Sequence, residues 1–80
     1  MNEEKLRLLF SVRDSGLGVA CQSKTLRDAC AGLYNFKDNY FIYNKDEWTE
    51  RLDSVLDEMN TLRIQLDQME ELVYDLRKLI

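Results

Sequence analysis

Two cysteines and several pairs of adjacent acidic residues are the side chains of this sequence whose types could do chemistry. A thiolate is a nucleophile and a metal ligand, and paired carboxylates can act as acid and base. However, the 80 residues contain no histidine, no paired Cys spacing of the zinc type and no glycine-rich phosphate loop. The carboxylate pairs Glu3-Glu4, Asp57-Glu58 and Glu70-Glu71 fall on predicted helix surfaces. We therefore expect no catalytic residue, no metal and no cofactor, and a protein that is not an enzyme.

The cysteines also bear on the compartment. Cys21 and Cys30 are too few to staple a secreted mini-protein, so we interpret them as reduced thiols in a cytosolic protein. The alternative role for each is that of a small buried hydrophobe. No apolar run approaches the roughly 20 residues that span a bilayer, and the acidic start lacks the basic region of a signal peptide. The sequence thus predicts a soluble, cytoplasmic chain with no membrane partner.

Charge is distributed unevenly along the chain, whose formal net charge is -4. Residues 1–45 carry seven Lys and Arg against five Asp and Glu, whereas residues 46–80 carry four against ten. An acidic total argues against phosphate binding by the whole molecule, but it leaves open a locally basic head (residues 1–45) on an acidic stalk (residues 46–80).

The stalk has the apolar spacing of a coiled coil. Its large apolar residues recur in steps of four and three without an error, and neither Pro nor Gly interrupts them. Acidic residues at the start and basic residues at the end agree with the helix dipole. The predicted oligomer interface consists of Trp48, Leu52, Val55, Met59, Leu62, Leu66, Met69, Val73, Leu76 and Ile80.

Size indicates how this stripe is covered. A helix over 48–80 would be about 50 Å long, whereas a globule of the preceding 45 residues would be only roughly 25 Å across. We therefore expect a second chain along the stalk, with a homodimer favoured over a higher oligomer. With Leu52 at heptad position a, Glu58 faces Arg63 in a parallel pair. Extra leucines at positions 56, 72 and 79 could pack on further helices, on the head of the same molecule or on a foreign target.

The head begins with two predicted helices. Residues 3–14 place Leu6, Leu9, Phe10 and Arg13 near one face, and Ser15-Gly16 and Gly18 are expected to end that helix. A second, short helix is expected at about 24–31, with Ser23 as its N-cap and Gly32 as its stop.

Aromatic residues follow that glycine and predict a strand pair. Leu33–Phe36 and Tyr40–Tyr43 flank the polar residues 37–39, which is typical of a short β-hairpin. The predicted fold is therefore mainly α, with a small helix-turn-helix-like head that bears a β-hairpin over 1–45. A coiled-coil oligomerisation helix follows over 46–80.

The stretch "SKTLRDACAGLYNFKDNYFIY" resembles the second half of the NUMOD1-like helix-turn-helix modules of phage proteins and homing endonucleases. Ser23, Leu26, Cys30 and Gly32 match a Ser/Thr-led helix with a glycine stop, and Tyr40 falls at the usual distance beyond it. "SVRDSGLGV" is similar to the first helix and turn, so the resemblance covers residues 11–43. The chain departs from the pattern after the glycine, where Leu33-Tyr34-Asn35 replaces the usual basic residue.

The resemblance and the helix-turn-helix geometry imply a set of nucleic-acid-binding candidates on the second helix, the hairpin and the first helix. They are Arg13, Gln22, Ser23, Lys24, Thr25, Arg27 and Lys37. Each has an ordinary alternative, since Lys24, Arg27 and Lys37 also suit solvated surface positions and Ser23 is a helix cap in either case.

Three functions follow from these features. The first is a small, phage-type DNA-binding regulator in which a coiled-coil dimer couples two heads. The second is a phage-encoded protein-interaction module, an inhibitor or adaptor of a host protein that uses the acidic coiled coil or the aromatic hairpin. The third is a structural oligomerisation protein.

Overall fold

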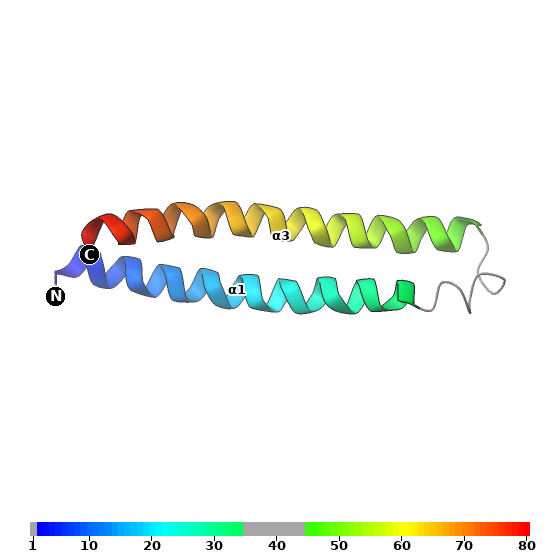
Figure 1. Ribbon diagram of the computed structural model, residues 1–80, viewed down its shortest axis with the longest axis horizontal. Helices are drawn as coiled ribbons and strands as arrows, with labels where there is room; N and C mark the ends of the chain where they lie inside the picture. The colour runs from blue at the N-terminus through cyan, green and yellow to red at the C-terminus, as the bar shows by residue number, and fades with distance from the viewer. Residues whose placement is uncertain (1, 35–44) are drawn as a thin grey trace.

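The computed structural model describes residues 2–34 and 45–80 and contains two long helices, α1 (Glu3–Tyr34) and α3 (Lys45–Leu79). They lie side by side and run in opposite directions, so the N- and C-termini meet at one end (Figure 1). The molecule measures 60 × 15 × 13 Å. Its radius of gyration is 18.0 Å, against about 12 Å for a compact domain of this length. The chain is an elongated helical hairpin.

Asn2 caps the first helix. Its side-chain Oδ1 accepts a hydrogen bond of 2.7 Å from the Lys5 amide, and its carbonyl accepts one of 3.2 Å from the Leu6 amide. An Asn at this place satisfies amides that lack a partner within the helix. Glu3 and Glu4 fill the first turn, where the helix dipole favours negative charge.

The glycines do not end the first helix, and the prediction of two short helices separated by a turn is wrong. Gly16, Gly18 and Gly32 all lie inside α1, and none has a positive φ. Ser23 is likewise an interior residue rather than an N-cap. A glycine costs a helix about 1 kcal/mol relative to alanine without blocking it, and packing along the whole length of α3 compensates for that cost.

The long helix predicted in the stalk is confirmed as one uninterrupted element, α3. Asp46 and Glu47 lie in its first turn and Arg77 and Lys78 in its last, as the dipole favours. Three threonine hydroxyls along the hairpin donate to the carbonyl four residues earlier, as in Thr61 to Asp57 at 3.1 Å. These bonds satisfy the hydroxyls within their own helices.

The mainly α class is confirmed, but the compact head is not. The structure has no strand among residues 2–34 and 45–80, and Leu33 and Tyr34 of the predicted β-hairpin belong to α1. The rest of that hairpin prediction, residues 35–43, lies outside the described residues. The size argument for a second chain was also wrong in its premise, because α1 is nearly as long as α3 and packs along it.

Candidate interaction surface

The predicted coiled-coil stripe of α3 divides into two rows with different environments. One row faces α1, and its two most buried members, Trp48 and Leu76, are 8% and 9% exposed. The members of the other row are each between 39% and 81% exposed. The inner row is Trp48, Val55, Leu62, Met69 and Leu76. The second row, here called the outer row, is Leu52, Met59, Leu66, Val73 and Ile80.

The division follows from which α3 positions meet α1. Besides the inner row, the half-buried α3 positions are Glu58, Gln65, Leu72 and Leu79. These residues also recur every seven positions, three residues after each inner-row member from Val55 onward, so they complete a seam of alternating steps of three and four. The face of α3 that packs on α1 is therefore centred to one side of the predicted apolar stripe. Half of that stripe packs inside the chain, and the outer row is left on the surface.

Charged residues border the outer row on its free side. Arg63, Glu70 and Arg77 recur at seven-residue spacing and are all exposed. No ion pair joins Arg63 or Glu70 to another residue within 2–34 and 45–80. Leu56 continues this border toward the start of α3 and is 60% exposed. The outer row is thus a long apolar strip with single, unpaired charges along one edge.

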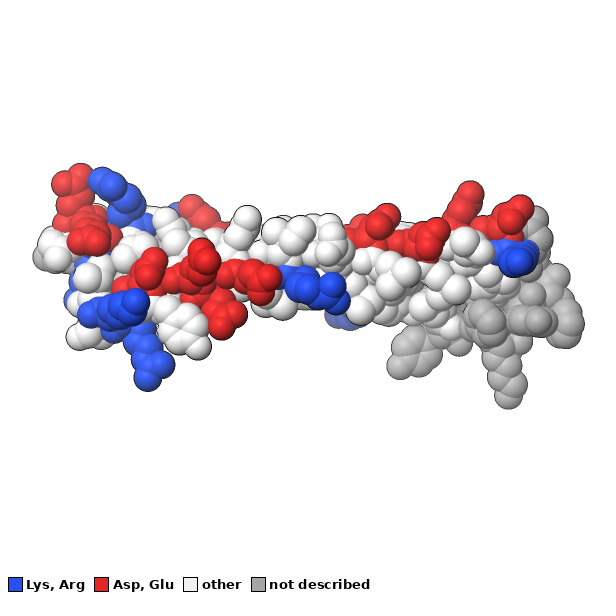
Figure 2. Space-filling model, turned by 90° about the horizontal axis from the view of Figure 1, so that it is seen from above, with Lys and Arg blue, Asp and Glu red and all other residues white. Residues whose placement is uncertain are grey.

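Two shallow hollows lie along this strip. One, of about 480 Å³, is lined by Leu66, Met69, Glu70, Val73, Tyr74 and Arg77. The other, of about 190 Å³, is lined by Leu26, Met59, Leu62, Arg63 and Leu66. Figure 2 looks down on α3 and shows groups of acidic side chains along the molecule, with basic side chains and uncharged surface between them. Both hollows are open and apolar, which suits the side chains of another helix better than a small polar ligand.

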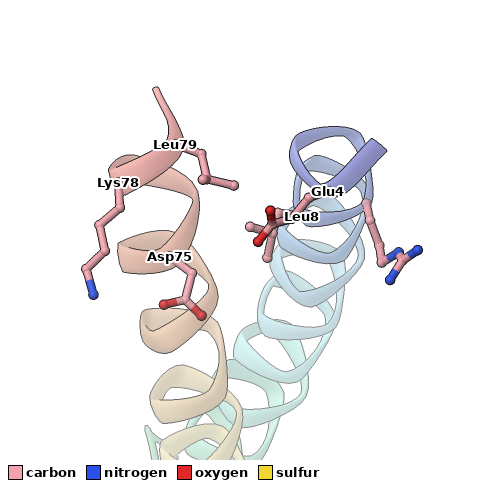
Figure 3. A pocket seen from close by; sticks show the side chains of 6 residues that line it. Glu4, Leu8, Asp75, Lys78 and Leu79 are labelled. Atoms are coloured by element: carbon pink, nitrogen blue, oxygen red, sulfur yellow. The ribbon is translucent and has the colours of Figure 1, made fainter. Parts of the chain in front are cut away.

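A third hollow lies where the chain ends meet. It has about 460 Å³ and is lined by Glu4, Arg7, Leu8, Asp75, Lys78 and Leu79. Leu8 and Leu79 extend into the space between the helices, and the Lys78 amine points away from it (Figure 3). Charges of both signs surround an apolar floor, an arrangement that matches the solvated end of a helix pair.

A polar contact crosses the middle of the hairpin. Gln22 Nε2 donates to the Glu58 backbone carbonyl at 3.1 Å and also to the Glu58 carboxylate. Both residues are half-buried in the seam. One heptad along, the equivalent positions hold Ser15 and Gln65; the serine is too short to repeat the contact, and Gln65 Oε1 is buried without a hydrogen-bond partner. The seam therefore contains a polar contact between the two helices and, one heptad along, a buried amide oxygen without a hydrogen-bond partner.

The structure distributes the nucleic-acid-binding candidates along one helix. Arg13 lies 3.3 Å from the Asp14 carboxylate and 4.9 Å over the Phe10 ring, and Arg27 lies 3.9 Å from Asp28. Steps of 11 and 3 residues put Arg13, Lys24 and Arg27 on a common side of α1.

The remaining candidates lie elsewhere. Gln22 faces α3, Ser23 is exposed, and the Thr25 hydroxyl donates to the Cys21 carbonyl at 3.2 Å. Lys37 lies outside the described residues. The predicted second helix, as a separate recognition element, is not formed.

The two cysteines lie on α1, and both are free thiols. Cys21 is exposed and Cys30 half-buried, and neither is in a disulfide. Within 2–34 and 45–80, no three His, Cys, Asp or Glu side chains come together as metal ligands would. Neither α1 nor α3 has a segment long and apolar enough to cross a membrane.

Sequence reasoning missed the heptad pattern of α1. The half-buried residues that follow steps of three and four are Lys5, Leu8, Val12, Ser15, Val19, Gln22, Leu26, Ala29 and Leu33. This pattern was present in the sequence, but its polar members and the neighbouring glycines obscured it. The face predicted for residues 3–14 was wrong, because Leu6 and Phe10 are 43% and 47% exposed.

Comparison of the chain with protein-family models, with curated proteins and with solved structures finds no match. The resemblance to NUMOD1-like modules stays a prediction.

Proposed function

We propose that this protein is a protein-interaction module that works as a homo-oligomer, with the outer row of α3 as its contact surface. The observation that carries the proposal is the regular exposure of five large apolar side chains, one every seven residues. A helix of a monomer normally turns its apolar stripe toward its own core, and a soluble chain rarely leaves such a strip uncovered.

The size of the surface supports the same proposal. The chain has 6460 Å² of accessible surface, whereas a compact protein of 9.5 kDa has roughly 5,000 Å². Part of the excess comes from the elongated shape of a single hairpin. Two hairpins packed side by side would have a smaller ratio of length to width. A specific interface needs about 800 Å² from each partner, so one face of a 60 Å hairpin is large enough.

The DNA-binding regulator stays a prediction. Arg13 and Arg27, two of its cations, already lie beside carboxylates, and the acidic residues of α3 extend along the adjoining helix. Phosphate contacts need cations that carboxylates do not already neutralise, so this arrangement favours protein over nucleic acid as the partner.

Light scattering after size exclusion tests the proposal with a matched pair of variants. Leu66→Asp places a charge in the outer row, and Ile64→Asp places one on nearly the opposite side of the helix. The two side chains are similarly exposed, at 46% and 51%, so neither substitution removes a buried side chain from the contact between α1 and α3. We expect Ile64→Asp to keep the wild-type oligomer mass and Leu66→Asp to give the monomer mass. Equal masses for the two variants would rule out the outer row as the contact surface.

A further inference from the structure

The outer row is symmetric about its middle member. Leu52 and Ile80 lie fourteen residues on either side of Leu66, and Met59 and Val73 lie seven residues on either side. A second copy of α3, turned by a two-fold axis through Leu66, would place Leu52 against Ile80 and Met59 against Val73. Every member of the row would then be covered. A shift by one heptad would leave an apolar side chain of each copy uncovered.

Charges on the border distinguish an antiparallel from a parallel pair. About a two-fold axis at Leu66, Arg63 of one copy lies opposite Glu70 of the other, and the pair occurs twice. Leu56 lies opposite the aliphatic stem of Arg77, which can cover it. In a parallel pair, the borders of the two copies would lie on opposite sides of the interface, so Arg63 of one copy would not meet Glu70 of the other. Glu58, whose pairing with Arg63 suggested parallel helices, is instead bonded to Gln22.

We propose that two hairpins pack face to face with their α3 helices antiparallel about Leu66, and that the Arg63–Glu70 pairs set this orientation. This inference rests on the proposed function, since it names the arrangement of the partner at the same surface. The product is an antiparallel four-helix bundle with the two connections at opposite ends. The α1 helices then also face each other through small residues beside the seam, the half-buried Gly16 and the exposed Ala20 and Ser23.

Cysteine cross-linking tests the position of the axis. The background is the chain with Cys21→Ser and Cys30→Ala, whose mass is first compared with the wild type by light scattering. Under mild oxidation, Leu66→Cys should give a covalent dimer, because a residue on a two-fold axis meets its own copy within disulfide range. Leu52→Cys alone should not link, whereas a mixture of Leu52→Cys and Ile80→Cys chains should give the mixed dimer. Ile64→Cys is the control that should stay unlinked.

A charge reversal tests the orientation without any covalent bond. Arg63→Glu and Glu70→Arg should each raise the dimer dissociation constant by about tenfold, because like charges then face each other. The double variant should return to within about threefold of the wild type. Both residues are exposed and unpaired within the described chain, so a merely structural role predicts no such rescue.

The outcomes separate this inference from the proposed function. A dimer that links through Leu66→Cys and is rescued by the double reversal supports both. A dimer that links through Leu52→Cys alone has parallel helices, and a dimer without any link at residue 66 packs α3 elsewhere. Either result overturns the arrangement and leaves the interaction module standing. A wild-type monomer overturns both.

Discussion

Gln22 of α1 donates through its Nε2 to both the backbone carbonyl and the carboxylate of Glu58 in α3, in the middle of the helix pair. Apolar side chains on either side could slide by a heptad with little loss, whereas this polar contact exists in one register only. Buried polar pairs of this kind fix alignment more than they add stability. The pair therefore sets the register of α1 against α3.

Removal of this contact should destabilise the hairpin. Gln22→Ala leaves the Glu58 carboxylate half-buried without its donor, which costs about 1 to 2 kcal/mol. The midpoint of thermal unfolding, followed by circular dichroism at a fixed concentration, should fall by several degrees. The exposed Gln68→Ala is the control and should leave the midpoint almost unchanged. Equal effects of the two substitutions would show that Gln22 has no special place in the seam.

A helix-stabilising substitution tests the continuity of α1. A Cβ added at Gly18 meets no atom within 4 Å, so Gly18→Ala should stabilise the chain by about 0.5 to 1 kcal/mol through helix propensity. The thermal midpoint should rise accordingly. A turn at this place, as the sequence predicted, would need the freedom of glycine, and alanine would then lower the midpoint.

Gly32→Ala is the companion substitution. There the new Cβ would lie 3.4 Å from Arg51 Nη1, the far end of a flexible side chain that must shift slightly. The gain in stability should be smaller than at Gly18, and the same melting experiment compares the two. A larger gain at position 32 than at 18 would contradict the packing of α3 against that glycine.

The unsatisfied amide in the seam offers a stabilising change. Gln65 Oε1 is buried without a hydrogen-bond partner, so Gln65→Leu removes a desolvated oxygen and adds apolar contact. We expect about 1 kcal/mol of added stability in urea unfolding, with an unchanged slope. Gln68→Leu, on the exposed side of α3, should give no comparable gain. A loss of stability at position 65 would mean that the amide has a partner in the folded protein.

Duplex DNA should bind weakly or not at all. The net charge is -4, and Arg13 and Arg27 lie beside Asp14 and Asp28. A fluorescence-anisotropy titration with mixed-sequence duplex at low and moderate salt measures this directly. Binding that weakens steeply with salt would contradict the expectation and restore the DNA-binding regulator as the leading hypothesis.

The sequence predicted α3 well because its repeat of four and three steps is unbroken and is reinforced by the charges at both ends. It failed on α1 because local signals, Gly16, Gly18 and the Ser23 cap, outweighed a weaker heptad pattern. That pattern includes Lys5 and Gln22, and its helix is stabilised by contacts with distant residues, such as that of Gln22 with Glu58, 36 positions away. Propensity is a local quantity, whereas such contacts depend on the fold.

The division between inner and outer rows was beyond the sequence for a different reason. A 3.5-residue repeat indicates that α3 has a helical partner, but it does not say whether the partner belongs to the same chain. Here one partner is α1, which packs against Val55 and Leu62 and leaves Leu66 exposed. The predicted interface was thus half intramolecular, and the outer row became visible only once α1 was placed.

The proposed dimer requires that the outer row is covered by another copy of the chain. Sedimentation equilibrium of the wild-type protein over a hundredfold range of concentration measures this, because association makes the mass depend on concentration. We predict a mass of twice 9.5 kDa at the upper concentrations, with dissociation only on dilution. A mass of 9.5 kDa at every concentration would show that the protein is a monomer and that no second copy covers the outer row.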